Sequence, residues 1–385
     1  MTSPSNPSDP QSFSRASTLA RAAFAVYALL LVYSGLAPWS RWRDLGLSPF
    51  SYLTAPIPTH VTNFDLVVNL LAYVPFGALL ALALHPLARG WTVVLLALLG
   101  GAVVAGSIEA MQSFLPTRIP SNLDLFTNCA GALLGALLAA PISSAVIDRG
   151  RLADWRRQWF SDRASLLLLV IALWPVAQIY PASMLFGNGD IRAELGGLLE
   201  ALPAVVSSLI PVADWIDDFD VAEFVLAEAF VVAAAVLAAG LGLASAMQRQ
   251  APRVKLLLAL LAITLLVKTF ANALQFGPDR ALAWLTPGAF GGLALGVLVL
   301  FAASAGPRLS RAWIALLAVA ALVLAVNLVP DNPYYTDAIG DWRQGELLNF
   351  NALARWLSLL WPFALAGTLT MMWLPQSARG PNATL

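Results

Sequence analysis

The chain has 385 residues, of which 59% are hydrophobic and 11% charged, whereas ordinary soluble domains carry about 25% charged residues. This composition excludes an ordinary soluble domain and predicts a membrane protein. The 22 basic residues balance the 22 acidic ones and form no dense run, so we expect no nucleic-acid partner. Cys129 is the single cysteine, which excludes an internal disulfide.

Ten apolar windows of about 20 residues, each long enough to cross a bilayer, predict an all-α polytopic transmembrane helical bundle. Residues 1–20 are polar and lack the features of a signal peptide, so we interpret them as a disordered cytoplasmic tail. The segment 194–216 is less apolar and contains two prolines, which favours an interfacial or re-entrant segment. The windows fall at about 22–39, 66–84, 91–114, 124–147, 164–181, 221–246, 254–276, 281–304, 312–330 and 351–374.

The basic residues between these windows predict the orientation of the chain. With the N-terminus in the cytoplasm, most of them fall in cytoplasmic segments, as the positive-inside rule requires. Because the number of windows is even, the C-terminus is also predicted to be cytoplasmic. The loop 182–220, which ends in several aspartates, then lies outside.

Three windows of the first half each carry a pair of polar residues spaced three or four apart. On a helix such a spacing places both residues on one face. In the predicted orientation all three pairs fall near the extracytoplasmic surface. Polar groups inside a bilayer are costly, so their cluster predicts a functional site. The pairs are Asp65 with Asn69, Glu109 with Gln112, and Asp124 with Asn128, and Arg118 lies in the loop between the last two.

These residue types allow two kinds of function. In an enzyme, paired carboxylates in a partly desolvated site divide the roles of acid and base, which makes Glu109, Asp124 and Asp65 the catalytic candidates. In a binding module, a guanidinium holds a phosphate or carboxylate and the amides orient it. The binding candidates are Arg118, Gln112, Asn69 and Asn128. A transporter is a third alternative, although the polar residues stop short of the midplane where such sites lie.

Most candidates also have a purely structural interpretation, which for Asn69 and Asn128 is interhelical hydrogen bonding. Glu109 and Gln112 lie within about one turn of a helix end and are therefore also explained by solvation. An acidic Asp124 in a first helical turn stabilises the helix dipole, and Arg118 is placed to form an ion pair with either carboxylate. We expect no cofactor and no metal, because His60 and His85 lie in loops on opposite sides.

A degenerate internal repeat links the two halves of the chain. Phe64-Asp65 resembles Phe219-Asp220, and the segment from Glu109 to Arg118 resembles the one from Asn272 to Arg280. We interpret the second half as a copy that has lost the site. Two polar residues at similar predicted depth, Glu228 and Lys268, are expected to form a buried ion pair that stabilises it.

The predicted organisation follows from these patterns. A four-helix membrane domain spans residues 21–147, and a degenerate second four-helix repeat spans 164–304 with the acidic loop 182–220. Two further helices occupy 312–374, and a cytoplasmic tail occupies 375–385.

The first half resembles the VanZ-like family of bacterial membrane proteins over roughly residues 20–147. Three blocks carry the resemblance: D-x3-N-x5-PFG from Asp65, S-x-E-x2-Q-x3-P-x-R from Ser107, and D-x3-N-x2-G-x3-G from Asp124. The resemblance implies a multi-pass protein of the bacterial inner (plasma) membrane. The founding member is linked to resistance to the glycopeptide teicoplanin, and other members to surface polysaccharide. The expected partners are therefore the lipid bilayer and an envelope glycolipid or phospholipid headgroup; the resemblance names no protein partner.

Overall fold

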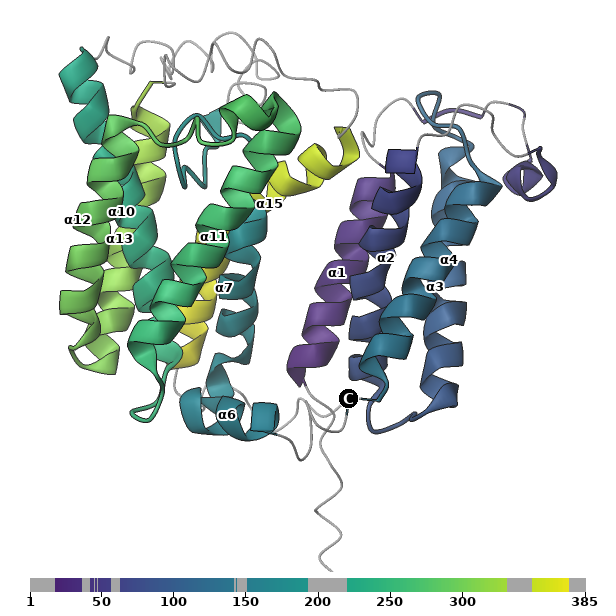
Figure 1. Cartoon of the computed structure of the whole chain (residues 1–385), viewed down its shortest axis with the longest axis horizontal. Helices are drawn as coiled ribbons and strands as arrows, with labels where there is room; N and C mark the ends of the chain where they lie inside the picture. The colour runs from purple at the N-terminus through teal and green to yellow at the C-terminus, as the bar shows by residue number, and fades with distance from the viewer. Residues whose placement is uncertain are drawn as a thin grey trace, which may run out of the picture. The chain divides into compact units, whose positions relative to one another are not determined.

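The computed structural model describes residues 18–36, 42–44, 46, 48–56, 63–141, 143, 151–192, 220–330 and 348–373. Within these residues the chain is helical, apart from one isolated β-bridge between Phe160 and Met247. This confirms the predicted all-α polytopic class. The chain divides into two compact units, Met1–Arg157 and Gln158–Leu385, and Figure 1 shows the long helices of each unit running roughly alongside one another.

In its described residues, the first unit contains four long helices and a short 3-10 helix, η2 (Ser51–Thr54). The long helices are α1 (Thr18–Leu36), α2 (Asn63–Leu84), α3 (Trp91–Gln112) and α4 (Asn122–Ala139). Apart from the polar residues near their ends, α2 and α3 are apolar on all sides. Such a helix is suited to lipid or to the interior of a bundle, because its own hydrogen bonds satisfy its backbone.

Six long helices of the second unit lie within the described residues, and α6 (Arg151–Trp159) spans the boundary between the units. The long helices are α7 (Ser165–Ala177), α10 (Val221–Ala246), α11 (Arg253–Phe276), α12 (Pro287–Ser304), α13 (Arg308–Leu328) and α15 (Leu348–Trp373). Nearly all of α10 from Val231 to Ala246 is buried, so this helix forms the centre of the unit. Two short 3-10 helices, η3 (Asp162–Ala164) and η5 (Pro278–Arg280), also belong to the described part of this unit.

Every predicted membrane window coincides with a helix of the described chain. Eight of these helices are long and apolar enough to cross a membrane, while α1 and α7 contribute shorter apolar stretches, Ala20–Leu36 and Ser165–Ala177. Large apolar side chains such as Val103, Leu266 and Leu298 are more than half exposed along these helices. In water that exposure would be costly, whereas in hydrocarbon it is favourable. The chain is therefore a multi-pass membrane protein.

Helices α2 and α4 pack against each other through glycine. A Cβ atom on Gly131 would collide with the carbonyl oxygen of Leu70, and one on Gly135 with that of Val74. From the other side, a Cβ on Gly77 would collide with the carbonyl oxygen of Ala132. Small residues four apart allow two helix backbones to approach this closely in a membrane. Gly131 and Gly135 therefore have a packing role between α2 and α4.

The second unit repeats this arrangement in α10 and α12. A Cβ on Gly292 would clash with the backbone of Ala229, and one on Gly296 would lie 3.0 Å from the Cα of Ala233. The duplication itself stays a prediction, but both units bring their second and fourth helices together through glycines four residues apart.

The segment that follows α7 is packed inside the second unit. Met184, Leu185 and Phe186 are at most 3% exposed. The Asn188 side chain accepts a hydrogen bond from Gln178 Nε2 at 2.8 Å and donates one to Ser358 Oγ at 2.8 Å, which connects α7 to α15. The expected interfacial segment 194–216, and most of the acidic loop, lie outside the described residues.

Candidate functional site

Glu109 lies in the last turn of α3 and is only 2% exposed. Its Oε2 accepts a hydrogen bond from the backbone N–H of Ser121 at 2.8 Å. Because Ser121 immediately precedes α4, this bond joins the end of α3 to the start of α4. The alternative interpretation, in which Glu109 is simply exposed to water at a helix end, is therefore wrong.

Ser121 is the N-cap of α4. Its side-chain oxygen accepts hydrogen bonds from the backbone N–H groups of Leu123 and Asp124, at 3.2 and 3.3 Å. This geometry is the usual way to satisfy the free donors at a helix start. Asp124 is half-buried in the first turn of α4, where an acidic side chain stabilises the helix dipole.

Arg118 lies in the short connection between α3 and α4 and is half-buried. Burial lowers the pKa of its guanidinium, and the nearby Glu109 carboxylate acts in the opposite direction. Asp124 also interacts electrostatically with Glu109. The structure thus places Glu109, Arg118 and Asp124 at one end of the first unit, close enough for their charges to interact.

Gln112 is turned toward a different helix from Glu109. Its Nε2 donates a hydrogen bond to the carbonyl oxygen of Gly35, near the end of α1, at 2.8 Å. The corresponding Gln275 in α11 donates to the carbonyl oxygen of Ile179, just after α7, at 2.6 Å. Both glutamines therefore tie the third helix of a unit to the end of its first helix, and Gln112 has a structural role whether or not it touches a ligand.

Two buried polar atoms lie on the helices beside Glu109. Asn128 in α4 is 8% exposed and Tyr73 in α2 is 4% exposed. Neither Asn128 Oδ1 nor the Tyr73 hydroxyl has a hydrogen-bond partner in the described structure, and Tyr73 lies within electrostatic range of Glu109. An unsatisfied buried polar atom costs about 1–3 kcal/mol, so a ligand or water that reached both atoms would be bound favourably.

The remaining candidates are less well defined. Asn69 is half-buried in α2, one turn before Tyr73. Asp65 belongs to the same helix, but its side chain is outside what the structure describes. The convergence of all seven candidates in a single pocket therefore stays a prediction.

Two residues at this end of the unit were not among the sequence candidates. Ser121 provides both the N-cap of α4 and the partner of Glu109, and the spacing from Ser121 to Asp124 is a helix-start signal that could have identified it. Tyr52 in η2 is 4% exposed and donates a hydrogen bond to the carbonyl oxygen of Gly106 at 3.2 Å. Burial, and then the negative charge of Glu109, raise the pKa of Tyr52. No helical periodicity marks Tyr52, because it lies in a loop.

The predicted ion pair between Glu228 and Lys268 is wrong. Glu228 Oε2 accepts a hydrogen bond from the hydroxyl of Thr286, the N-cap of α12, at 2.6 Å. Lys268 Nζ instead donates to the carbonyl oxygen of Tyr180 at 3.5 Å. The position of each residue along its apolar helix predicted that both side chains are buried. It did not predict which neighbouring helix each side chain faces.

The described residues contain no group of three or more His, Cys, Asp or Glu side chains that could hold a metal ion. Of the two histidines, His85 is buried, and His60 lies outside the described residues. The polar groups near this end of the first unit are one guanidinium, two carboxylates, three amides and two phenols, from Arg118, Glu109, Asp124, Asn69, Gln112, Asn128, Tyr52 and Tyr73.

The fold and the polar end of the first unit define a membrane-embedded helical domain. Residues 24–143 match the family model described as VanZ/LLP1, so this part of the chain is a VanZ-like domain, as its motifs predicted. Comparisons with curated proteins and with solved structures gave no match.

Proposed function

We propose that the VanZ-like domain binds the polar headgroup of an envelope lipid or glycolipid at its extracytoplasmic end. The observation that carries this proposal is the half-buried guanidinium of Arg118 beside the buried Glu109 and the first turn of α4. A guanidinium in a partly dry site forms stronger, bidentate bonds to phosphate or carboxylate than an exposed one. The helices around it are exposed to lipid, so a lipid headgroup is the ligand that reaches it most directly.

Binding is better supported than catalysis because Glu109 already has a structural role. Its Oε2 accepts the Ser121 N–H bond that fixes the start of α4, so this carboxylate contributes to the connection between α3 and α4 without any ligand. We therefore assign Glu109 to positioning Arg118 and α4, and Arg118 to contacting the ligand. The amide of Asn128 and the phenol of Tyr73 provide unpartnered polar atoms deeper in the same unit.

The proposed orientation of the chain, with this end outside the cell, is tested by cysteine labelling. In a Cys129→Ala background, a cysteine at the exposed Thr117 should react with a membrane-impermeant maleimide in intact cells. A cysteine at the exposed Gln250, which follows α10 at the other predicted surface, should react only after the membrane is permeabilised. The reverse labelling pattern would place the Arg118 end in the cytoplasm and contradict the proposal.

Headgroup binding is tested by the lipids that co-purify with the full chain. Mass spectrometry should find one lipid or glycolipid enriched with the wild-type protein and reduced about tenfold or more with Arg118→Ala, because a charge-assisted bond is lost. Arg118→Lys should fall between them, since an ammonium lacks the bidentate geometry. Arg43→Ala removes an exposed positive charge from the same unit and serves as the matched control.

Equal lipid content in the wild type and Arg118→Ala would reject the binding proposal. Lipid profiles of cells lacking the protein separate binding from turnover. A species that accumulates in the deletion, and persists when the strain is complemented with Glu109→Gln, would show that the domain transforms its ligand.

A further inference from the structure

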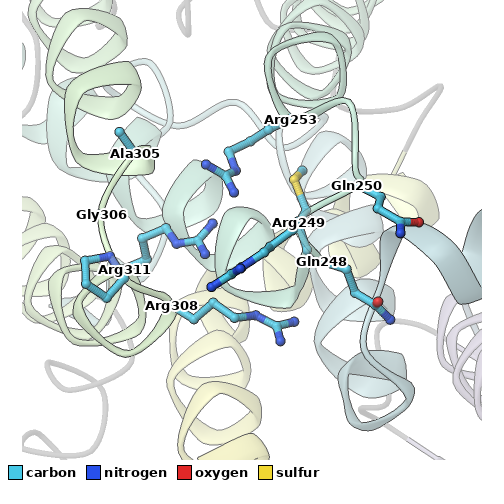
Figure 2. A pocket seen from close by; sticks show the side chains of 10 residues that line it. Gln248, Arg249, Gln250, Arg253, Ala305, Gly306, Arg308 and Arg311 are labelled. Atoms are coloured by element: carbon cyan, nitrogen blue, oxygen red, sulfur yellow. The ribbon is translucent and has the colours of Figure 1, made fainter.

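A separate pocket of about 790 Å³ lies in the second unit, where α10 and α12 end and α11 and α13 begin. This volume is typical of a small-molecule site. Four arginines contribute to its wall, and Figure 2 shows the guanidinium groups of Arg249, Arg253 and Arg311 directed toward one another. The lining residues are Met247, Gln248, Arg249, Gln250, Arg253, Ala305, Gly306, Pro307, Arg308 and Arg311.

Backbone carbonyls hold three of these arginines in place. Arg311 donates to the carbonyl oxygen of Ala244 at 2.6 Å and Arg308 to that of Ala246 at 3.2 Å, at the end of α10. Arg253 donates to the carbonyl oxygen of Ser304, at the end of α12, at 2.8 Å.

These bonds occupy few of the available donors, because each guanidinium has five N–H groups. In the part of the chain that the structure describes, the buried Nε–H groups of Arg253, Arg308 and Arg311 have no hydrogen-bond partner. The wall therefore holds donors that the described chain leaves unsatisfied.

The helix ends add further positive potential to this pocket. Arg253 and Arg308 are the first residues of α11 and α13, and neither helix has a side-chain N-cap. Basic side chains normally favour the C-terminal end of a helix, because the N-terminal end already carries about half a positive charge. Two such starts beside four arginines give this pocket a positive potential that favours an anion.

The charge of the pocket is not balanced by its own wall, since none of the ten lining residues is Asp or Glu. The positive-inside rule explains basic residues at this end of the helices, but exposed side chains would satisfy it. Arg311 is only 4% exposed, and burying a guanidinium is costly unless an anion or acceptors compensate it. The positive-inside rule alone therefore does not explain why an arginine of this pocket is buried.

We propose that this pocket binds a phosphate-bearing anion, held by Arg253, Arg308 and Arg311 and closed off by the exposed Arg249. Phosphate matches the planar donor pattern of guanidinium groups and the free N–H groups of helix starts. The phosphate can belong to an anionic phospholipid, since the pocket lies at the ends of membrane helices, or to a soluble phosphorylated molecule. The proposal does not depend on the site in the VanZ-like domain.

The test uses the purified full chain and consists of two experiments, one for a soluble phosphorylated ligand and one for a phospholipid. Inorganic pyrophosphate is titrated into the protein in phosphatidylcholine nanodiscs by calorimetry. In parallel, native mass spectrometry compares the retention of phosphatidylglycerol with that of phosphatidylcholine. Binding in the first experiment indicates a soluble ligand, and selective retention in the second indicates a lipid.

We expect the variant Arg253→Gln/Arg308→Gln to weaken the observed binding by about tenfold or more, because charge-assisted hydrogen bonds are lost. Lys255→Gln is the matched control, since Lys255 is exposed in the same first turn of α11 and does not line the pocket. It should bind within about twofold of the wild type, because exposed charges are screened by salt.

Absence of binding in both experiments would overturn the proposal, as would equal binding by the double variant and the wild type. If the double variant aggregates on size-exclusion chromatography, Arg249→Gln replaces it, because Arg249 is exposed and its removal should leave the fold intact. That variant should bind about threefold more weakly than the wild type. Unchanged affinity would also overturn the proposal.

Discussion

Gly135→Ala should destabilise the VanZ-like domain by about 2 kcal/mol or more, although it adds only one methyl group. The new Cβ would collide with the carbonyl oxygen of Val74 and lie 2.9 Å from the backbone nitrogen of Ala78. Neither atom can rotate away as a side chain could, so α2 and α4 must separate along their length. We expect the apparent melting temperature of the purified protein to fall by roughly 5 °C or more.

Gly291→Ala provides the control for this substitution. Gly291 lies on α12 between the packed Gly288 and Gly292, and a Cβ there would meet no atom within 4 Å. This variant should melt within about 2 °C of the wild type, because surface substitutions usually change stability by less than 0.5 kcal/mol. Equal melting of the two variants would show that the close approach of α2 and α4 contributes little to stability.

The helices were predictable because their signal is local. A window of apolar residues marks a membrane helix whatever it packs against, and all ten windows coincide with helices. The exact ends of the helices depend on individual capping residues, which the average apolar character of a window does not resolve. The window 281–304 begins too early, because Thr286 caps α12 and Pro287 occupies its first position, a combination typical of a helix start.

The contacts between helices were much less predictable. Spacing along a helix places Glu109 and Gln112 on similar faces, yet Glu109 bonds to the start of α4 and Gln112 to the end of α1. The pocket of four arginines joins residues more than fifty positions apart, and in the sequence those arginines indicated only the orientation of the chain. Which helices become neighbours is set by close backbone contacts such as those of Gly131 and Gly135, and local patterns do not contain that information.

Two substitutions of Glu109 should separate its contribution to stability from its contribution to ligand binding. Glu109→Ala removes the acceptor of the Ser121 N–H and leaves a cavity, so it should cost about 2–4 kcal/mol and lower the melting temperature by several degrees. Glu109→Gln keeps an acceptor oxygen of the same reach and should stay within about 1 kcal/mol of the wild type. The comparison requires thermal unfolding and lipid co-purification on the same preparations.

The glutamine variant distinguishes the proposed role of Glu109 from catalysis. If Glu109 only positions Arg118 and α4, Glu109→Gln should retain the bound headgroup, because removing a negative charge from beside Arg118 does not weaken its attraction for an anion. If the carboxylate transfers a proton, the same variant should fold normally and accumulate the unprocessed lipid. Glu228→Gln in the second unit is the matched control, since Glu228 is also 2% exposed and accepts a hydrogen bond at the start of a helix. Loss of the same headgroup in Glu228→Gln would contradict the assignment of that headgroup to the site in the VanZ-like domain.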